Sequence, residues 1–397
     1  MSNPQISPLG MSAETLEALT AIRRDIHAHP ETCYEEFRTS DIVAQKLESW
    51  GIAVTRGIGG TGVVGVLKNG SSHRAIGLRA DMDALHIHEE NSFDHKSTIN
   101  GKMHACGHDG HTTMLLGAAQ SLAAERNFDG TLHFIFQPAE EGGAGAKAMM
   151  DDGLFERFPC DAVYGIHNMP SIASGVLGVC SGPIMAASDA WAVDFHGTGG
   201  HGSMAHKGTD PMIPAAHFVL GLQSIVGRNV DPLDSVSLSP GYIHGGSEGS
   251  PNIIPAHIRI GGRTRAFKPE TRELLLRRIR ELAENTAIAH GCTAEVKVEK
   301  GYPPTVNWDE QTQVVVRAAN RALGSEQVNP KMTPLPGSED FSYFLEKVPG
   351  CYAFLGNGLC QADEFVHAPR YDFNDHIIPA GVAFWKALVE EELPLQK

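Results

Sequence analysis

Residues 130–142 read GTLHFIFQPAEEG, an apolar run that ends directly in two adjacent carboxylates. Gly130–Phe136 has the length and the aromatic and β-branched content of a buried strand, and Pro138 ends it. Glu140 and Glu141 follow at once. In an open α/β sheet, ligands bind beyond the carboxyl ends of the strands. This stretch therefore predicts both a sheet strand and a place for chemistry at its end.

Two further predicted strands end in residues of the same kind. Ala75–Arg79 leads into Asp81 and Asp83. Ala162–Ile166 leads into His167. Since parallel strands share one carboxyl edge, these carboxylates and this imidazole are expected to gather there.

Helical periodicity alternates with these strands, which is typical of an α/β layer built on a largely parallel sheet. The predicted helices of the N-terminal half are Ala13–His29, Glu36–Trp50, Thr112–Glu125 and Ala144–Asp151, and a further strand covers Thr61–Leu67. The same style resumes from Thr305, with helices predicted near Glu310–Leu323, Ser338–Glu346 and Pro379–Glu392.

A different order follows Ser181-Gly182-Pro183. The predicted elements are strand Asp189–Phe195, helix Pro211–Arg228, strand Ser235–Tyr242, strand His257–Arg265, helix Pro269–His290 and strand Thr293–Lys300. This βαββαβ order is the ferredoxin-like unit, a complete small domain. We therefore predict a discontinuous α/β domain, residues 1–185 and 302–397, with residues 186–301 inserted as a second domain.

The composition limits the class of protein. A chain of 397 residues is too long for one ordinary core and favours two domains. The net charge of −15 and the lack of a basic stripe argue against a nucleic-acid partner. No apolar run approaches a membrane span, and Met1–Thr15 carries no secretory signal. Seven cysteines without a paired framework fit a reducing, cytoplasmic setting.

Metal-binding residue types cluster upstream of the paired glutamates. Residues 103–111 read MHACGHDGH, which offers a thiolate and several imidazoles in one short stretch. Cys106 and His108 precede the predicted Thr112–Glu125 helix, where the helix dipole and a metal would both favour a thiolate. A carboxylate from Glu140 or Glu141 completes the N, S and O ligands that zinc or a similar ion takes.

The two glutamates suit different tasks, because adjacent side chains on an extended segment point to opposite sides. One would serve as a ligand and the other as the base that a metal-dependent hydrolase needs. The alternative is a solvated acidic pair on a loop. His104 and His111 are expected to support the ligands or to lie on the helix surface. His167 is either a core histidine or a ligand.

Nine short motifs occur once each, in order, along the chain. They are RRDIHAHPE at 23–31, RADMDAL at 79–85, HACGHD at 104–109, PAEEG at 138–142, GIHN at 165–168, GGHG at 199–202, NIIP at 252–255, SEDF at 338–341 and HAPRYDFND at 367–375. Over nearly the whole chain this set resembles the metal-dependent amidohydrolase family of hippurate hydrolase, plant auxin-conjugate hydrolases and bacterial N-acyl-amino-acid amidohydrolases. That family is a branch of the group that contains aminoacylase and glutamate carboxypeptidases.

The resemblance implies a dinuclear-metal, exopeptidase-like α/β/α catalytic domain with a ferredoxin-like lid or dimerisation domain inserted. It also implies two divalent ions per subunit, with Zn²⁺ first and Mn²⁺, Co²⁺ or Ni²⁺ as alternatives. The implied ligands are Cys106 as a bridge, His108, Glu141, His167 and His367. Glu140 falls on the family's general base, and Asp83 falls on a residue that orients the site.

The resemblance extends to the inserted domain. His201 falls on a lid histidine that donates to the oxyanion, in related enzymes across a dimer. Asn252 and Arg265 fall where the family grips the terminal carboxylate of the substrate, a group that an arginine fork matches. Arg263 lies close enough to Arg265 to be the alternative for this role.

We interpret the chain as an amidase that hydrolyses N-acyl or N-aroyl amino acids to a carboxylic acid and a free amino acid. A dipeptidase or carboxypeptidase-like activity is the alternative within the same chemistry. A non-catalytic protein that binds amino-acid conjugates is the alternative of another class, but it would not need Glu140. A structural metal protein is disfavoured, because structural sites are usually closed Cys-rich tetrahedra. The expected partners are the small substrate and further copies of the chain, in a homodimer or homotetramer.

Overall fold

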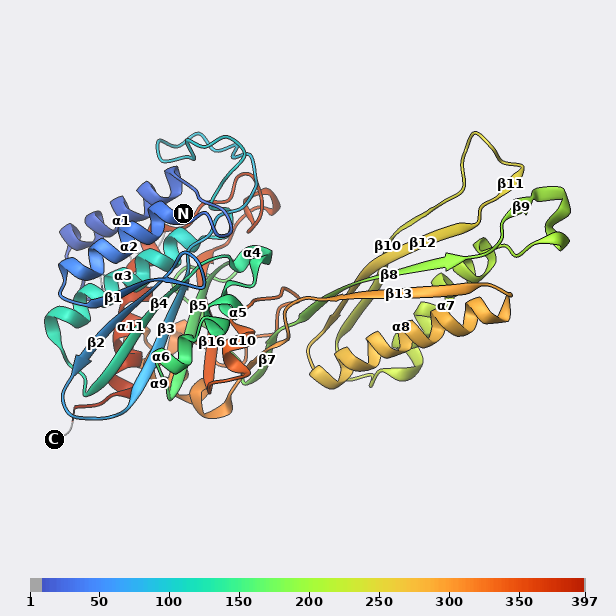
Figure 1. Ribbon diagram of the computed structural model, residues 1–397. Helices are drawn as coiled ribbons and strands as arrows, with labels where there is room; N and C mark the ends of the chain where they lie inside the picture. The colour runs from blue at the N-terminus through green and yellow to red at the C-terminus, as the bar shows by residue number, and fades with distance from the viewer. Residues whose placement is uncertain (1–8, 396–397) are drawn as a thin grey trace. The chain divides into compact units, whose positions relative to one another are not determined.

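The computed structural model describes residues 9–395 and divides them into two compact units (Figure 1). The first unit comprises the chain up to Gly182, residues 306–333, and the chain from Asp340 onward. The second unit comprises residues 183–305 and 334–339. The chain passes from one unit to the other within the short strands β7 (Gly182–Met185) and β14 (Thr305–Asn307), and again at the two ends of residues 334–339.

An eight-stranded sheet forms the centre of the first unit as described. Its strands, in spatial order, are β1 (Ala53–Ile58), β2 (Gly62–Asn69), β4 (Gly130–Gln137), β3 (Ala75–Asp81), β5 (Ala162–Pro170), β16 (Gly350–Gly358), β6 (Leu177–Gly178) and β15 (Val328–Asn329). Strands β4, β3, β5 and β16 run parallel, whereas β2 pairs antiparallel with both β1 and β4, and β6 pairs antiparallel with β16. The sheet is therefore mixed, with a parallel centre that is buried on both faces.

Helices cover this sheet (Figure 1). They are α1 (Ala13–Ala28), α2 (Phe37–Ser49), α3 (His108–Glu125), α4 (Glu140–Gly143), α5 (Gly145–Asp151), α6 (Leu154–Arg157), α9 (Asp309–Leu323), α10 (Ser342–Leu345) and α11 (Ile378–Glu392), with 3-10 turns at Ser325–Gln327, Ala362–Glu364 and Asp375–Ile377. Helix α3 packs against β3, α1, α2 and α11, so nearly all of its side chains are buried. Because α3 is buried, the candidate metal ligands at its start, Cys106 and His108, are held in fixed positions.

The structure differs from the predicted elements at two places that matter for the site. Only Ser342–Leu345 of the predicted helix Ser338–Glu346 is helical, because the Asp340 side chain accepts hydrogen bonds from the Gln137 side chain and from the backbone of Ala146. Strand β5 continues through Pro170, so His167 lies within the strand instead of after it. The glycine-rich strand β16 was not predicted.

The second unit has the predicted βαββαβ order. Its antiparallel sheet has the strand order β10 (Val236–Gly245), β12 (His257–Ala266), β8 (Ala187–His196) and β13 (Thr293–Lys300). Helices α7 (Met212–Asn229) and α8 (Pro269–Ala289) pack on it. Alternate residues of β8, namely Trp191, Val193 and Phe195, meet Phe218 of α7 in the core. The predicted fold class, an α/β domain with a smaller ferredoxin-like insert, is confirmed.

A small hairpin extends from this unit. Strands β9 (Gly200–His201) and β11 (Ile253–Ile254) pair, and a 3-10 turn covers Gly202–Lys207. Across the residues described in both units, no helix has the length and apolar character needed to cross a bilayer.

Candidate metal centre

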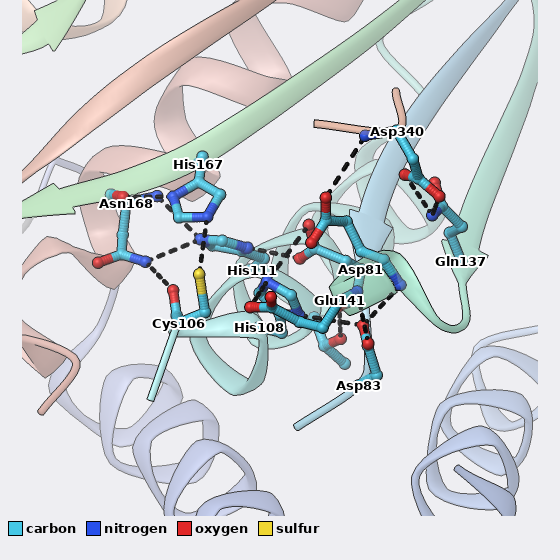
Figure 2. Close-up of polar contacts among 12 residues, drawn as sticks. Asp81, Asp83, Cys106, His108, His111, Gln137, Glu141, His167, Asn168 and Asp340 are labelled. Carbon is cyan, nitrogen blue, oxygen red and sulfur yellow. Dashed lines mark hydrogen bonds and ion pairs between the residues drawn. The ribbon is translucent and has the colours of Figure 1, made fainter. Parts of the chain in front are cut away.

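The implied ligands of the first unit come together at the carboxyl edge of its parallel strands (Figure 2). Cys106 and His108 stand at the start of α3, Glu141 lies in α4 just after β4, and His167 lies in β5. His367 lies in a loop near the C-terminus, where its backbone N–H donates to the carbonyl oxygen of Ala105 at 2.7 Å. Segments far apart in the chain thus meet within one site.

Cys106 belongs to two overlapping groups of ligand-type atoms. Its sulfur lies 3.3 Å from Nε2 of His167, and these two residues form one group with His108. The second group contains Cys106, Glu141 and His367, in which Nε2 of His367 lies 3.1 Å from Oε1 of Glu141. Within each group the ligand atoms lie within 4.8 Å of one another. Two groups that share one thiol fit a pair of bridged ions.

The imidazoles are oriented as metal ligands are in proteins. His108 lies 3.2 Å through Nδ1 from Oδ1 of Asp83, and its buried Nε2 has no hydrogen-bond partner among the described residues. His167 donates from Nδ1 to the carbonyl oxygen of Asn168, which leaves Nε2 facing the sulfur of Cys106. A ligating histidine characteristically uses its second nitrogen in this way. The donor set therefore fits divalent metal.

The site concentrates negative charge. Burial raises the pKa of the Cys106 thiol, and the neighbouring Glu141 and Glu140 carboxylates raise it further. Burial lowers the pKa of His108, but the carboxylates of Asp81 and Asp83 outweigh it and raise this pKa to about 10. A divalent cation would reverse the first of these shifts, because it favours the thiolate.

Gly107 separates the first two implied ligands and adopts a left-handed φ of 88°. A Cβ atom at this position would lie 2.2 Å from Nδ2 of Asn168 and 2.3 Å from Oη of Tyr371. The same Nδ2 donates to the carbonyl oxygen of Cys106 at 2.6 Å, and Tyr371 donates to Oδ1 of Asn168 at 2.7 Å. Glycine therefore permits a close approach that holds Cys106 in place.

Residues 139–144, here called the glutamate turn, carry Glu140 and Glu141. Asp83 holds this turn, because its Oδ1 accepts the backbone N–H of Glu140 at 3.0 Å and its Oδ2 accepts that of Glu141 at 2.9 Å. Glu141 faces His367, whereas Oε1 of Glu140 accepts the backbone N–H of Asp340 at 3.4 Å. The two side chains thus have different polar partners, although both carboxylates also lie in one group of ligand-type atoms with His108. Glu140 is buried.

His111 and His104 are both buried, so neither lies on the helix surface. Nδ1 of His111 lies 2.5 Å from Oδ1 of Asp81, and its Nε2 accepts the backbone N–H of Asn168 at 2.8 Å (Figure 2). His111 thereby supports the segment next to His167. Neither ring nitrogen of His104 has a hydrogen-bond partner within the described part of the chain.

The second unit holds the remaining predicted site residues. His201 and Asn252 lie together in the hairpin, where the backbone N–H of Gly202 donates to the carbonyl oxygen of Asn252 at 2.8 Å. Both side chains are exposed. Arg265 lies on β12 and is half-buried, two residues along the strand from Arg263.

Sequence reasoning missed several buried residues that support the site. Glu36 binds the backbone of Ala139 in the glutamate turn, and Asp340 binds that of Ala146 just after it. Glu36 was interpreted only as the start of a helix, and Asp340 only as part of a helix and of the SEDF motif, with no role in the site. A buried carboxylate leaves no local signal in a single sequence, because most acidic residues are exposed.

The fold and this site together define a metal-dependent hydrolase. The chain belongs to peptidase family M20/M25/M40, whose sequence profile matches residues 77–391. The resemblance inferred from the ordered motifs is thereby confirmed.

Individual proteins with similar sequences and structures support this family assignment. A hippurate hydrolase of Campylobacter jejuni is 43% identical over 92% of this chain and 94% of its own length. An N-acetyl-L-cysteine deacetylase of Bacillus subtilis is 40% identical over 94% of this chain and 87% of its own. The crystal structure of a dinuclear metal-binding M20 peptidase from Bacillus subtilis superposes with a TM-score of 0.84 at 29% identity, over 96% of this chain and 98% of that one.

Proposed function

We propose that this protein hydrolyses the amide bond of N-acyl and N-aroyl amino acids, releasing a carboxylic acid and a free amino acid. The observation that carries the proposal is the pair of ligand groups sharing Cys106, with Glu140 buried beside them. Metal-dependent amide hydrolysis uses a metal that activates the electrophile and a base within reach of the attacking water. The names of the hippurate hydrolase and the N-acetyl-L-cysteine deacetylase support the same substrate class.

The proposed cofactor is a pair of divalent ions, with Zn²⁺ first and Mn²⁺, Co²⁺ or Ni²⁺ as alternatives. Cys106 would be shared, with His108 and His167 on one side and Glu141 and His367 on the other. Thiolate, imidazole and carboxylate together suit these borderline metals better than Mg²⁺ or Ca²⁺. When bound, such ions supply Lewis acidity that makes water more acidic and the amide carbonyl more electrophilic.

Proton transfer during hydrolysis would be carried out by a side chain of this protein. Glu140 would take a proton from the attacking water and then deliver it to the leaving amine. Its partner Asp83 would hold both the base and His108 in position through one carboxylate. The different polar partners of Glu140 and Glu141 support the assignment of one as base and the other as ligand.

His201 would donate a hydrogen bond to the tetrahedral oxyanion. Its Nδ1 accepts the backbone N–H of Ser203 at 3.2 Å, so the proton of the neutral ring lies on Nε2. The exposed ring therefore presents an N–H donor. A preorganised oxyanion donor contributes about 3–4 kcal/mol to transition-state stabilisation.

Arg265 is the proposed anchor for the substrate carboxylate, together with Asn252. Nη1 of Arg265 is buried and has no hydrogen-bond partner within the described residues. Arg263 instead donates from Nη1 to Oγ of Ser188 at 3.3 Å. An unsatisfied guanidinium nitrogen favours Arg265 for this role, because it gains most from an incoming carboxylate.

We further propose that the second unit serves as the lid and dimerisation domain, in a homodimer or homotetramer.

We also propose a cytoplasmic location. The seven cysteines lie in the described residues and form no disulfide, which supports a reducing, cytoplasmic setting.

Side-by-side assays of metal-loaded protein test the function. Hippurate and a series of N-acetyl amino acids should be cleaved with larger kcat/KM values than dipeptides. The similar Bacillus subtilis structure is described as a peptidase, which makes dipeptide cleavage the second candidate. Faster turnover of dipeptides would favour that candidate, and turnover of neither class would refute the proposal.

A further inference from the structure

The glutamate turn has a backbone that needs support from outside. Ala139 and Ala144, its first and last residues, have left-handed φ values of 52° and 53°. For an alanine this conformation costs about 1–2 kcal/mol relative to the right-handed region. Such residues persist only where surrounding contacts hold them. The contacts that hold this turn therefore determine where the Glu140 carboxylate lies.

One contact holds the start of the turn. Oε1 of Glu36 accepts the backbone N–H of Ala139 at 2.9 Å and that of Tyr34 at 3.0 Å. Its Oε2 accepts the hydroxyl of Thr61. Glu36 is fully buried, yet both carboxylate oxygens are satisfied. A buried carboxylate needs such donors to offset its lost hydration.

Residues 33–36, which contain Glu36, also hold the end of the turn. The Tyr34 hydroxyl donates to the carbonyl oxygen of Gly143 at 2.7 Å. Tyr34 itself has a left-handed φ of 62°, which is uncommon for an aromatic residue. Gly143 packs directly on the segment, since a Cβ there would lie 2.2 Å from the sulfur of Cys33 and 3.2 Å from the Tyr34 ring.

These contacts bracket Glu140 and Glu141 on both sides. Glu36 binds the residue just before Glu140, and Tyr34 binds a residue two positions after Glu141. Asp83 binds the amides between them. The N–H groups of residues 139, 140 and 141 thus all donate to buried carboxylates from other segments.

We propose that Glu36 and Tyr34 are positioning residues that hold the glutamate turn so that Glu140 meets the attacking water. This inference rests on the proposed function, in which Glu140 is the base. Neither residue would touch the substrate or a metal. Their effect should fall on kcat, because a base misplaced by about 1 Å costs on the order of 10²-fold in rate.

The test compares Glu36→Ala, Glu36→Gln and Tyr34→Phe with the parent and with Glu392→Gln as a matched control. Glu392 is also a buried carboxylate, held by Tyr164 and Arg74 at the start of the central strands, opposite the site edge. Steady-state kinetics on hippurate, metal content by elemental analysis and the thermal midpoint are measured for each.

Glu36→Ala should lower kcat by about 10²-fold. Its KM should stay within about threefold, with full metal content, since substrate and metal contacts remain. Glu36→Gln should retain most of kcat, because its amide oxygen can accept both N–H groups and its NH₂ can bind Thr61. Tyr34→Phe should lower kcat by about 2–10-fold, the contribution of one hydrogen bond. Glu392→Gln should lose stability but not kcat.

Two results would overturn the inference. One is a Glu36→Ala kcat equal to that of Glu392→Gln, and the other is metal loss in proportion to the lost activity. If Glu36→Ala does not fold, Tyr34→Phe decides, and a parental kcat in that variant would end the idea. A Glu140→Gln variant run in parallel distinguishes failure of the proposed base from failure of the positioning role. If it is active, the proposed base is wrong; if it is inactive while the Glu36 and Tyr34 variants match the parent, only the positioning role fails.

Discussion

Oδ1 of Asp83 lies 3.2 Å from Nδ1 of His108. The same carboxylate accepts the backbone N–H groups of Glu140 and Glu141. One buried residue therefore orients an implied ligand and also fixes the backbone of the proposed base. If His108 binds metal and Glu140 is the base, as proposed, metal binding and placement of the base would be coupled through this carboxylate.

We expect Asp83→Asn to weaken metal binding by about 10–100-fold, as loss of a partner behind a ligating histidine does. The amide replaces one acceptor by an NH₂ group, so an N–H of the glutamate turn or of His108 loses its partner. Titration of metal-free protein against a competing chelator measures the affinity. Parental affinity in the variant would show that His108 is oriented without this carboxylate.

Glu140→Gln and Glu141→Gln should have opposite effects. Glu140→Gln keeps the metal but lowers kcat by about 10²–10⁴-fold, the range attributed to general base catalysis. Glu141→Gln weakens metal binding, because it removes a charged ligand. Metal content and kcat are measured on the same preparations. If Glu140→Gln loses metal while Glu141→Gln keeps both metal and activity, the two roles are reversed.

Cys106, His108 and the paired glutamates could be picked out as candidate site residues because their signals are local, whereas His167 stayed open between core residue and ligand and His367 came only from the family resemblance. Cys106 and His108 lie in one short stretch, and Glu140 and Glu141 follow an apolar run that ends at Pro138. Strand ends and ligand spacing can be recognised within a few residues. The βαββαβ order of the second unit was predicted for the same reason, since each element shows its own periodicity.

The supporting residues could not be predicted, because their partners are distant in the chain. Glu36 meets Ala139 across 103 positions, and Asp340 meets Ala146 across 194. Neither pairing leaves a trace near either residue. Strand β16 was missed because its sequence, GCYAFLGNG, is rich in glycine, which is depleted in strands and typical of turns. Its central, buried position overrides that preference.

The shared thiol predicts two ions per subunit and a strong effect of its removal. Cys106→Ser should reduce the bound metal at saturation, since it removes an atom common to both ligand groups. Elemental analysis after dialysis against a fixed free-metal concentration measures the content. Metal affinity of the parent should also fall in acid, because the ligands must be deprotonated. One tightly bound ion in the parent, or normal content in the variant, would count against a bridging thiolate.

His133 predicts an acid-dependent loss of stability. Burial lowers the pKa of this strand residue to about 4, although a hydrogen bond to the Pro159 carbonyl raises it slightly. In the unfolded chain His133 titrates near pH 6.5. Between about pH 6.5 and 4 the unfolded state binds a proton that the folded state does not, so the free energy of unfolding falls as pH falls. Above pH 6.5 this contribution is fully present.

The difference between the parent and His133→Phe isolates this effect. Urea unfolding of both metal-free proteins at several pH values gives two stability curves. The variant should lack up to about 1.4 kcal/mol per pH unit of slope in that range, the effect of one proton. Parallel curves for the two proteins would show that folding does not lower the pKa of His133.

His201→Ala should lower kcat by about 10²–10³-fold with metal content unchanged, because an oxyanion donor acts mainly in the transition state. His201 is exposed in the hairpin of the second unit, and its Nε2–H is available for donation. If it serves the site of a partner subunit, mixing His201→Ala with Glu140→Gln should restore activity, since each mixed dimer would contain one intact site. Kinetics of His201→Ala that match the parent would refute the donor role. If mixed dimers are shown to form but activity is not restored, His201 would act only on the active site of its own chain.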